Sequence, residues 1–381
     1  MREGGSSLVD EKQNRVLELT ANSLFNLGSE ELHYNGEIIS ELLSQAVLPI
    51  ALPAHKLVSS IIAANMQVSY EHTELHDLLT ENSIPYVFLK GVASASYYPN
   101  PILRTMGDVD FLINSADIPR AASLLESIGF EIAVDDDDNG IHIAFHRDDS
   151  TWEMHRSING IPEGKVGNQV RRYLSDIIET AVDYDEGNGI IKIPDDFHHG
   201  LVLLLHTASH LTSEGVGLRH LCDWAVFVNR FAEEHFSALF EDKLKSCGLW
   251  RFAQLLSLTS VKFLHLPYQL WMGDADEVIL EQLITDIMNG GNFGHKDEDR
   301  YRQIKYISNR GENTVDRKPT VLQLWDTIGK KAEAQGKSRL AVVGDYASMV
   351  LKGERKLDNR ETLKQAAERK KLYSEFRLFE V

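Results

Sequence analysis

Two aspartates separated by one residue stand at the head of an apolar run, and this pattern constrains the fold more than any other segment. The run from Gly107 to Ile113 reads Gly-Asp-Val-Asp-Phe-Leu-Ile. In a β-strand, side chains two apart point to the same face, so Asp108 and Asp110 are predicted to share one face. Two carboxylates this close repel each other by roughly 4 kcal/mol at an effective dielectric of 20. A divalent cation relieves that repulsion, and carboxylate oxygens suit Mg²⁺.

Asp-x-Asp pairs also occur in turns and at strand ends without a metal, so the neighbouring segments decide between the two interpretations. Upstream, residues 84–91 form an apolar strand that ends in Lys90-Gly91. A helix-like stretch over residues 92–98 follows, and Pro99 and Pro101 close it. The pair is therefore predicted to lie on a strand that follows a strand–turn–helix unit.

Downstream, residues 130–156 divide into three predicted strands. Residues 130–134 alternate between apolar and polar, and Asn139-Gly140 is a hairpin signal. The chain is expected to return over residues 141–147, turn at 148–150, and run back over 151–156.

The last of these strands carries a third acidic side chain. Thr151, Glu153 and His155 are predicted to share one face, while Trp152 and Met154 take the other. Glu153 is thus expected on a strand near the aspartate pair, facing a defined side of the sheet.

Together these segments resemble the nucleotidyltransferase superfamily typified by DNA polymerase beta, and more closely an uncharacterised bacterial nucleotidyltransferase family with a Leu-Lys-Gly signature. The resemblance extends from the N-terminal helices to about residue 290. It rests on the motifs at residues 88–91, 97–99, 104, 107–113 and 152–155. It implies an α+β fold, in which a polymerase-beta-like mixed sheet is flanked by N-terminal and C-terminal helical regions.

Two departures from the superfamily pattern stand out. Many members have Gly-Ser where this chain has Lys90-Gly91, so Ser94 is expected to supply the missing hydroxyl. Glu153 stands where Asp is more usual, which leaves open whether it is a metal ligand or a general base.

The resemblance implies a Mg²⁺-dependent transfer of a nucleoside monophosphate from an NTP. Asp108, Asp110 and Glu153 would hold one or two Mg²⁺ ions that bridge the triphosphate, and Glu153 either completes the metal site or accepts the proton of the acceptor hydroxyl.

The implied phosphate-binding residues lie around the Lys-Gly turn. Gly91 would let the backbone approach a phosphate, beside the N-terminus of the helix that carries Ser94. Lys90 and Arg104 would supply positive charge. The alternatives are a solvated Lys90 at a strand end, and an Arg104 that forms an ion pair with Asp108 or Asp110.

A histidine-rich helical region admits two interpretations. Its members are His198, His199, His206, His210, His220 and Asp223, around the Gly-Leu-Arg motif that ends at Arg219. Arg219 and Asp223 are predicted to line a nucleotide or acceptor cleft, and the alternative is an Arg219–Asp223 ion pair among packed histidines. Imidazoles with a carboxylate also fit the metal site of a phosphohydrolase.

The amino-acid composition limits the kinds of acceptor and partner that are expected. The chain carries 57 acidic against 39 basic residues, a formal charge of −18. Long nucleic acids need a basic surface, so a small-molecule, peptide or protein acceptor is expected. Cys222 and Cys247 cannot form a disulfide framework. With no signal core and no apolar stretch of membrane-spanning length, a cytoplasmic protein without a membrane partner is expected.

The chain is expected to comprise four parts. These are an N-terminal helical region (1–80), a nucleotidyltransferase α/β core (81–195), a helical domain that closes the cleft (196–295) and a charged helical segment (296–381), with amphipathic stretches at 321–328 and 340–351 and a terminal helix. The leading hypothesis is NMP transfer to a hydroxyl or phosphate of a non-nucleic-acid acceptor. A phosphohydrolase built on the histidines and an inactive nucleotide-binding module are the alternatives, and the sequence does not indicate the oligomeric state.

Overall fold

A computed structural model describes residues 9–25, 27, 35–47, 56–133, 141–292 and 360–381. The chain divides into two compact units, one comprising Met1–Arg300 with Leu372–Val381 and the other comprising Tyr301–Lys371. The predicted parts 1–80, 81–195 and 196–295 all fall within the first unit. Only residues 360–371 of the second unit are described.

A mixed five-stranded sheet lies in the first unit. Its strands are β1 (Tyr86–Phe88), β2 (Val109–Ile113), β3 (Glu131–Ile132), β4 (His142–Arg147) and β5 (Ser150–His155). Their spatial order is β1-β2-β5-β4-β3. β2 and β5 run parallel, and the other neighbouring strands are antiparallel. β6 (Val182–Asp185) and β7 (Ile190–Ile193) form a separate antiparallel pair.

One face of the sheet forms the apolar core. The core residues of the two central strands are at most 1% exposed, and they are Val109, Phe111, Ile113, Trp152 and Met154. These are the alternate positions of β2 and β5, so the predicted two-residue alternation is confirmed in both strands. The carboxylates at the intervening positions therefore face the other way.

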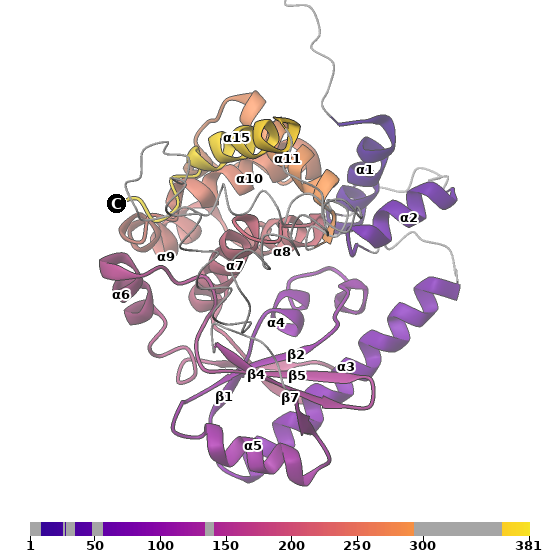
Figure 1. Ribbon diagram of the computed structural model, residues 1–381, viewed down its shortest axis with the longest axis vertical. Helices are drawn as coiled ribbons and strands as arrows, with labels where there is room; N and C mark the ends of the chain where they lie inside the picture. The colour runs from indigo at the N-terminus through magenta and orange to yellow at the C-terminus, as the bar shows by residue number, and fades with distance from the viewer. Residues whose placement is uncertain (1–8, 26, 28–34, 48–55, 134–140, 293–359) are drawn as a thin grey trace, which may run out of the picture. The chain divides into compact units, whose positions relative to one another are not determined.

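Helices cover both faces of this sheet. α3 (Lys56–Glu81) and α5 (Ile118–Ser127) contribute apolar side chains to the core. α5 lies below the sheet in Figure 1 and the short α4 (Gly91–Ala95) lies above it. The helix predicted over 118–128 is confirmed, whereas the stretch 92–98 yields only α4. Tyr98 precedes a proline, and such residues disfavour the helical conformation.

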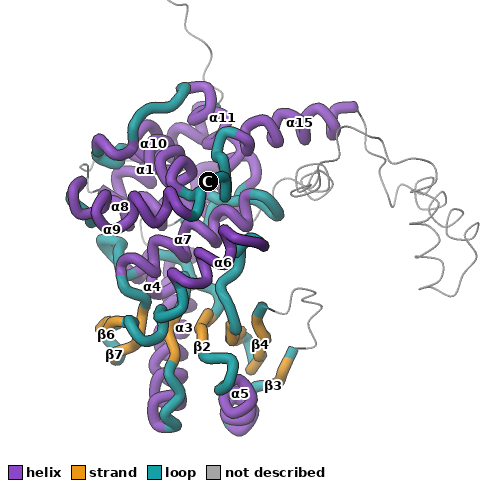
Figure 2. Tube along the Cα trace, turned by 90° about the vertical axis from the view of Figure 1, so that its left-hand side faces the viewer, coloured by secondary structure: helices purple, strands orange, loops and turns teal. Residues whose placement is uncertain are grey.

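The other helices of the described residues make up the rest of the fold. They are α1 (Glu11–Phe25), α2 (Gly36–Ser44), α6 (Gly164–Tyr173), α7 (Asp196–Leu211), α8 (Leu218–Asn229), α9 (Glu233–Ser246), α10 (Trp250–Leu264), α11 (Glu277–Gly290) and α15 (Arg360–Ser374), with the 3₁₀ turns η1 (Pro101–Leu103) and η2 (Leu270–Met272). Figure 2 shows the strands gathered at one end of the first unit, with α7 to α11 at the other. No helix among the described residues is long and apolar enough to span a bilayer.

The sequence-predicted elements are largely found. The return to helical periodicity near residue 195 is confirmed, because Asp195 caps α7 by accepting a hydrogen bond from the His198 backbone N–H. β3 and β4 pair antiparallel, as the hairpin prediction requires, although β3 is shorter than residues 130–134. The Asn139-Gly140 turn and the stretches 321–328 and 340–351 lie outside the described residues. Both cysteines are buried free thiols.

Candidate active site

The structure brings two of the three predicted carboxylates, Asp110 and Glu153, together on the face of the sheet opposite the core. Asp110 is the direct partner of Glu153 in the parallel register of β2 and β5, and Asp108 immediately precedes β2. Asp110 is buried, whereas Asp108 and Glu153 are half-buried. Ligand atoms of Asp110, Glu153 and His155 lie within 4.8 Å of one another. This is a set of oxygen donors, with one nitrogen donor, that is suited to a cation.

The repulsion expected between the two aspartates is visible at Asp108. The negative charge of Asp110, together with burial, raises the pKa of Asp108 to about 6. Its carboxylate has no hydrogen bond or ion pair within the described part of the chain. The two oxygens of Asp108 are therefore available to a cation, which would relieve this repulsion.

Asp110 is neutralised by two side chains of the protein. The Lys90 Nζ and the His155 Nε2 each lie 2.7 Å from its Oδ1. Burial alone would raise the pKa of Asp110, but Lys90 and the hydrogen bond from His155 outweigh burial and hold that pKa well below its usual range. Burial likewise opposes the charge on Lys90, yet Asp110 and Asp108 outweigh it, so the pKa of Lys90 is raised. Both ends of this ion pair are charged.

Lys90 occupies a strained turn between β1 and α4. Its φ is +46°, a value that non-glycine residues adopt at a cost of about 1–3 kcal/mol. The preceding residue is held to the sheet, because the Leu89 N–H donates to the Asp110 carbonyl oxygen at 2.8 Å. Lys90, which was predicted to bind phosphate, therefore lies at the candidate active site, with its ammonium group paired with Asp110.

Gly91 and Ser94 follow on α4. A Cβ placed on Gly91 would meet Arg104 and Met106 only at 3.9 Å, an ordinary van der Waals distance, so packing does not require glycine here. Ser94 is 1% exposed, and its Oγ has no hydrogen-bond partner among the described residues. Buried hydroxyls are normally bonded, so this orphaned donor fits a role in ligand binding.

Arg104 is bound by a different carboxylate from those expected. Its Nε and Nη2 donate to the two oxygens of Asp223 at 3.2 and 2.7 Å. Tyr98 donates to the same carboxylate at 2.7 Å. The alternative considered from sequence, an Arg104 pair with Asp108 or Asp110, is replaced by this buried bidentate pair. The guanidinium joins the segment before β2 to α8.

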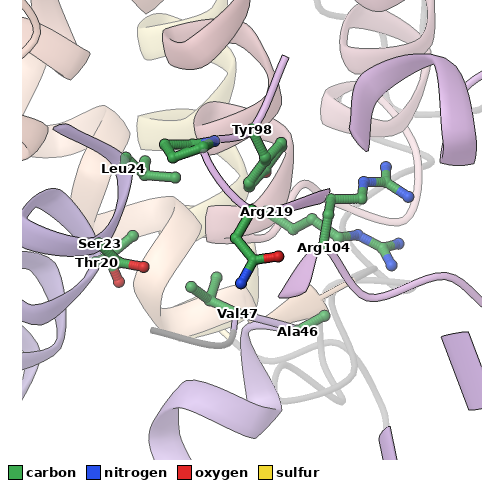
Figure 3. A pocket seen from close by; sticks show the side chains of 10 residues that line it. Thr20, Ser23, Leu24, Ala46, Val47, Tyr98, Arg104 and Arg219 are labelled. Atoms are coloured by element: carbon green, nitrogen blue, oxygen red, sulfur yellow. The ribbon is translucent and has the colours of Figure 1, made fainter. Parts of the chain in front are cut away.

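Arg219 lies beside this pair and reaches the same segment. Its Nη1 donates to the Thr105 carbonyl oxygen at 3.2 Å, and its charge acts on the Asp108 carboxylate. A pocket lined by both arginines has a volume of about 20 Å³, which is room for about one water molecule. Figure 3 shows both guanidinium groups on the side of this pocket opposite Thr20 and Leu24. This pocket is too small for a nucleotide.

The five histidines of the helical region separate into three environments. His198 lies by the α7 cap, with its Nδ1 2.9 Å from Asp195. His199 is stacked on Tyr97 with ring centroids 5.0 Å apart, and burial lowers the pKa of His199 to about 3. The rings of His206, His210 and His220 converge. Only this last group has the arrangement of a ligand set.

His155 is the site residue that the sequence interpretation left without a role. It lies on β5, is 3% exposed, and contacts both Asp110 at 2.7 Å and Glu153 at 3.4 Å. Burial opposes its charge, but the hydrogen bonds with Asp110 and Glu153 outweigh burial, so the pKa of His155 is raised. The signal was present in the sequence, because the alternation had placed His155 on the Glu153 face.

Nucleotidyltransferases present their acidic residues on neighbouring strands of a mixed sheet, and this sheet, flanked by helices, is of that kind. Comparison with known families agrees. The chain belongs to the family described as uncharacterised nucleotidyltransferase, whose model matches residues 36–265. This range runs from α2 to the end of α10 and contains every candidate site residue, which confirms the resemblance inferred from the motifs. No curated protein matches the chain.

Proposed function

We propose that this protein transfers a nucleoside monophosphate from an NTP to a hydroxyl or phosphate group of a small-molecule, peptide or protein acceptor, in a Mg²⁺-dependent reaction. In such a transfer the acceptor oxygen bonds to the α-phosphorus of the NTP and pyrophosphate leaves. Membership of a nucleotidyltransferase family supports NMP transfer in general. The net charge of −18 supports an acceptor other than a long nucleic acid.

The observation that carries the proposal is the register of β2 and β5. It sets Glu153 directly opposite Asp110, with Asp108 one position before β2 and without a partner among the described residues. A purely structural pair of aspartates would be expected to have both carboxylates satisfied. The raised pKa of Asp108, caused first by Asp110, instead indicates uncompensated negative charge.

The donor set fits Mg²⁺. Asp108, Asp110 and Glu153 would hold the ion, because Asp110 and Glu153 are paired carboxylates on one face and the adjacent Asp108 lacks a partner within the described residues. When bound, Mg²⁺ would stabilise the charge that develops on the attacking and leaving oxygens. Lys90 neutralises Asp110 in the structure. A Mg²⁺ ion bound to Asp110 would take over that role and free the Lys90 ammonium group for the triphosphate.

The residues around the turn would bind and orient the phosphates. At Gly91 the backbone is not shielded by a side chain, and Ser94 offers a buried hydroxyl without a protein partner among the described residues. Glu153, half-buried and next to His155, would serve as a ligand or accept the acceptor's proton.

The segment before β2 would be positioned from α8. The Arg104–Asp223 pair and the bond from Arg219 to Thr105 hold the residues that lead into Asp108. We propose that Arg219 faces the nucleotide or acceptor, and that Arg104 and Asp223 act indirectly, by holding the segment before β2 in place.

The test is transfer of label from α-labelled ATP, CTP, GTP and UTP, with Mg²⁺ and sets of hydroxyl-bearing and phosphate-bearing acceptors. Asp108→Asn and Glu153→Gln should each abolish transfer while the protein stays folded. Glu131→Gln, an exposed carboxylate on β3, is the matched control and should retain full activity. Full transfer by the Asp108→Asn/Glu153→Gln double variant would refute the proposal. NTP binding without transfer to any acceptor would indicate an inactive nucleotide-binding module.

A further inference from the structure

Three histidine rings from two helices converge at the face of the helical region that neighbours Lys90. His206 and His210 are four residues apart on α7 and share one side of that helix, and His220 belongs to the first turn of α8. The ring centroids are 4.4 Å apart for His206 and His210, and 5.5 and 5.6 Å from these to His220. One nitrogen of each ring lies within 4.8 Å of the others.

His206 and His210 are half-buried and His220 is buried. Burial, followed by the charge of His210, lowers the pKa of His206 well below its ordinary value. Burial and the charge of Arg219 do the same to the pKa of His220. Neutral imidazole offers a nitrogen lone pair. The three converging rings thus bring nitrogen donors together, unlike the carboxylate set on the sheet.

We propose that His206, His210 and His220 bind one transition-metal ion of the Zn²⁺ class, at a site separate from the carboxylate site. Imidazole nitrogens suit Zn²⁺, Co²⁺, Ni²⁺ and Cu²⁺, whereas Mg²⁺ prefers oxygen ligands. Three protein ligands leave a coordination position open to water or to a substrate atom, as in catalytic zinc sites.

Contacts behind the rings support this assignment. The Glu214 Oε2 lies 3.5 Å from the Nδ1 of His210, and a carboxylate behind a metal-binding imidazole commonly orients the ring and raises its basicity. The Gly217 N–H lies 3.3 Å from the Nδ1 of His220. This contact orients the imidazole of His220 in the first turn of α8.

The position of the cluster connects it to the candidate active site. Arg219 directly precedes His220 on α8, and the positive charges of Lys90 and Arg219 act on His206, so the cluster lies within electrostatic range of the side chains proposed to face the phosphates. An ion bound here would add positive charge near the anionic substrate.

The test is a Co²⁺ titration of the full-length chain, prepared without a histidine tag and freed of metal with EDTA. We expect one equivalent of Co²⁺ with the visible absorption of a nitrogen-ligated ion, displaced by Zn²⁺, which binds such ligands more tightly. His206→Gln and His210→Gln should each weaken Co²⁺ binding by at least about tenfold. His235→Gln is the matched control, because His235 is exposed on α9 and distant in sequence from the cluster. That variant should bind Co²⁺ as the wild type does.

Two further measurements make the outcome decisive. The Asp108→Asn/Glu153→Gln variant should keep its Co²⁺ equivalent, so that loss of the signal in this variant would assign the ion to the carboxylate site and overturn the proposal. The X-ray absorption spectrum of the Co²⁺-loaded wild type should show imidazole ligands, and an oxygen-only shell would overturn the proposal without any variant. Neither readout depends on nucleotide transfer, so this inference and the proposed function fail independently.

Discussion

Substituting Gly91 with alanine separates a phosphate-binding role for this residue from a purely structural one. The added methyl group would meet Arg104 and Met106 at 3.9 Å, which is ordinary contact. Gly91 is also not among the positive-φ glycines, so alanine is compatible with its backbone conformation. The protein itself offers no reason for glycine at this position, whereas a phosphate approaching the backbone does.

The expected magnitudes follow from that geometry. Gly→Ala at a compatible position stabilises a protein by about 0.4–1 kcal/mol, mainly by restricting the unfolded chain. A methyl group between the backbone and a phosphate would displace the reacting groups by about 1 Å, and displacements of that size cost on the order of 10²-fold in rate. We therefore expect Gly91→Ala to be slightly more stable and about 10²-fold less active.

The assay pairs urea unfolding with NMP transfer or, before an acceptor is known, with NTP binding. Gly36→Ala is the matched control, since Gly36 begins α2 as Gly91 begins α4 and a Cβ there would meet nothing within 4 Å. It should gain similar stability and keep full activity. If Gly91→Ala binds and transfers nucleotide like the wild type, the reasoning about backbone approach is refuted.

Three further outcomes are expected from urea unfolding. Lys90→Met should destabilise the protein by about 2 kcal/mol by leaving Asp110 short of a buried partner, and adding Asp110→Asn should restore most of this loss. Asp195→Asn keeps the hydrogen bond that caps α7 but removes the carboxylate charge. Burial alone would raise the pKa of Asp195, but the contacts with His198 outweigh burial and lower that pKa to about 2. The stabilisation from ionised Asp195 is complete above the pKa that this carboxyl has in the unfolded chain, and it is lost as pH falls toward about 2. The pKa of His198 is raised in the folded protein, so the stabilisation from charged His198 is lost as pH rises through that folded-state pKa. Asp195→Asn should therefore cost about 1 kcal/mol near pH 5 and less near pH 9, after discounting for partial exposure; an equal cost at both would contradict this. Gly200→Ala should cost about 1–3 kcal/mol, because its Cβ would lie 2.7–2.8 Å from two buried phenylalanine rings.

Local periodicity predicted much of the site. The alternation over residues 151–155 placed Glu153 and His155 on one face and the core residues Trp152 and Met154 on the other, as the structure has them. The same alternation placed Asp110 opposite the core face of β2, whereas Asp108 lies just before the strand. A two-residue period is a property of the extended backbone itself, so it can be read without knowing the partner strand.

Partners across long sequence separations were not predictable in the same way. Arg104 was expected at the phosphates or beside Asp108 or Asp110, but its guanidinium lies on Asp223, 119 residues away. The sequence placed five histidines in one helical region, but which three of them converge depends on the packing of α7 against α8. Which carboxylate an arginine meets depends on helix packing, and nothing in the local sequence records it.

The sequence by itself determined the five strands of the sheet, the face on which Asp110 and Glu153 lie and the family, because these follow from short-range geometry and contiguous motifs. Tertiary structure alone decided the β2–β5 register that sets Asp110 opposite Glu153, the neutralisation of Asp110 by Lys90 and His155, and the meeting of His206, His210 and His220. The physical reason is that charge interactions and ligand sets depend on distances of a few ångströms between side chains, which only the packed chain fixes.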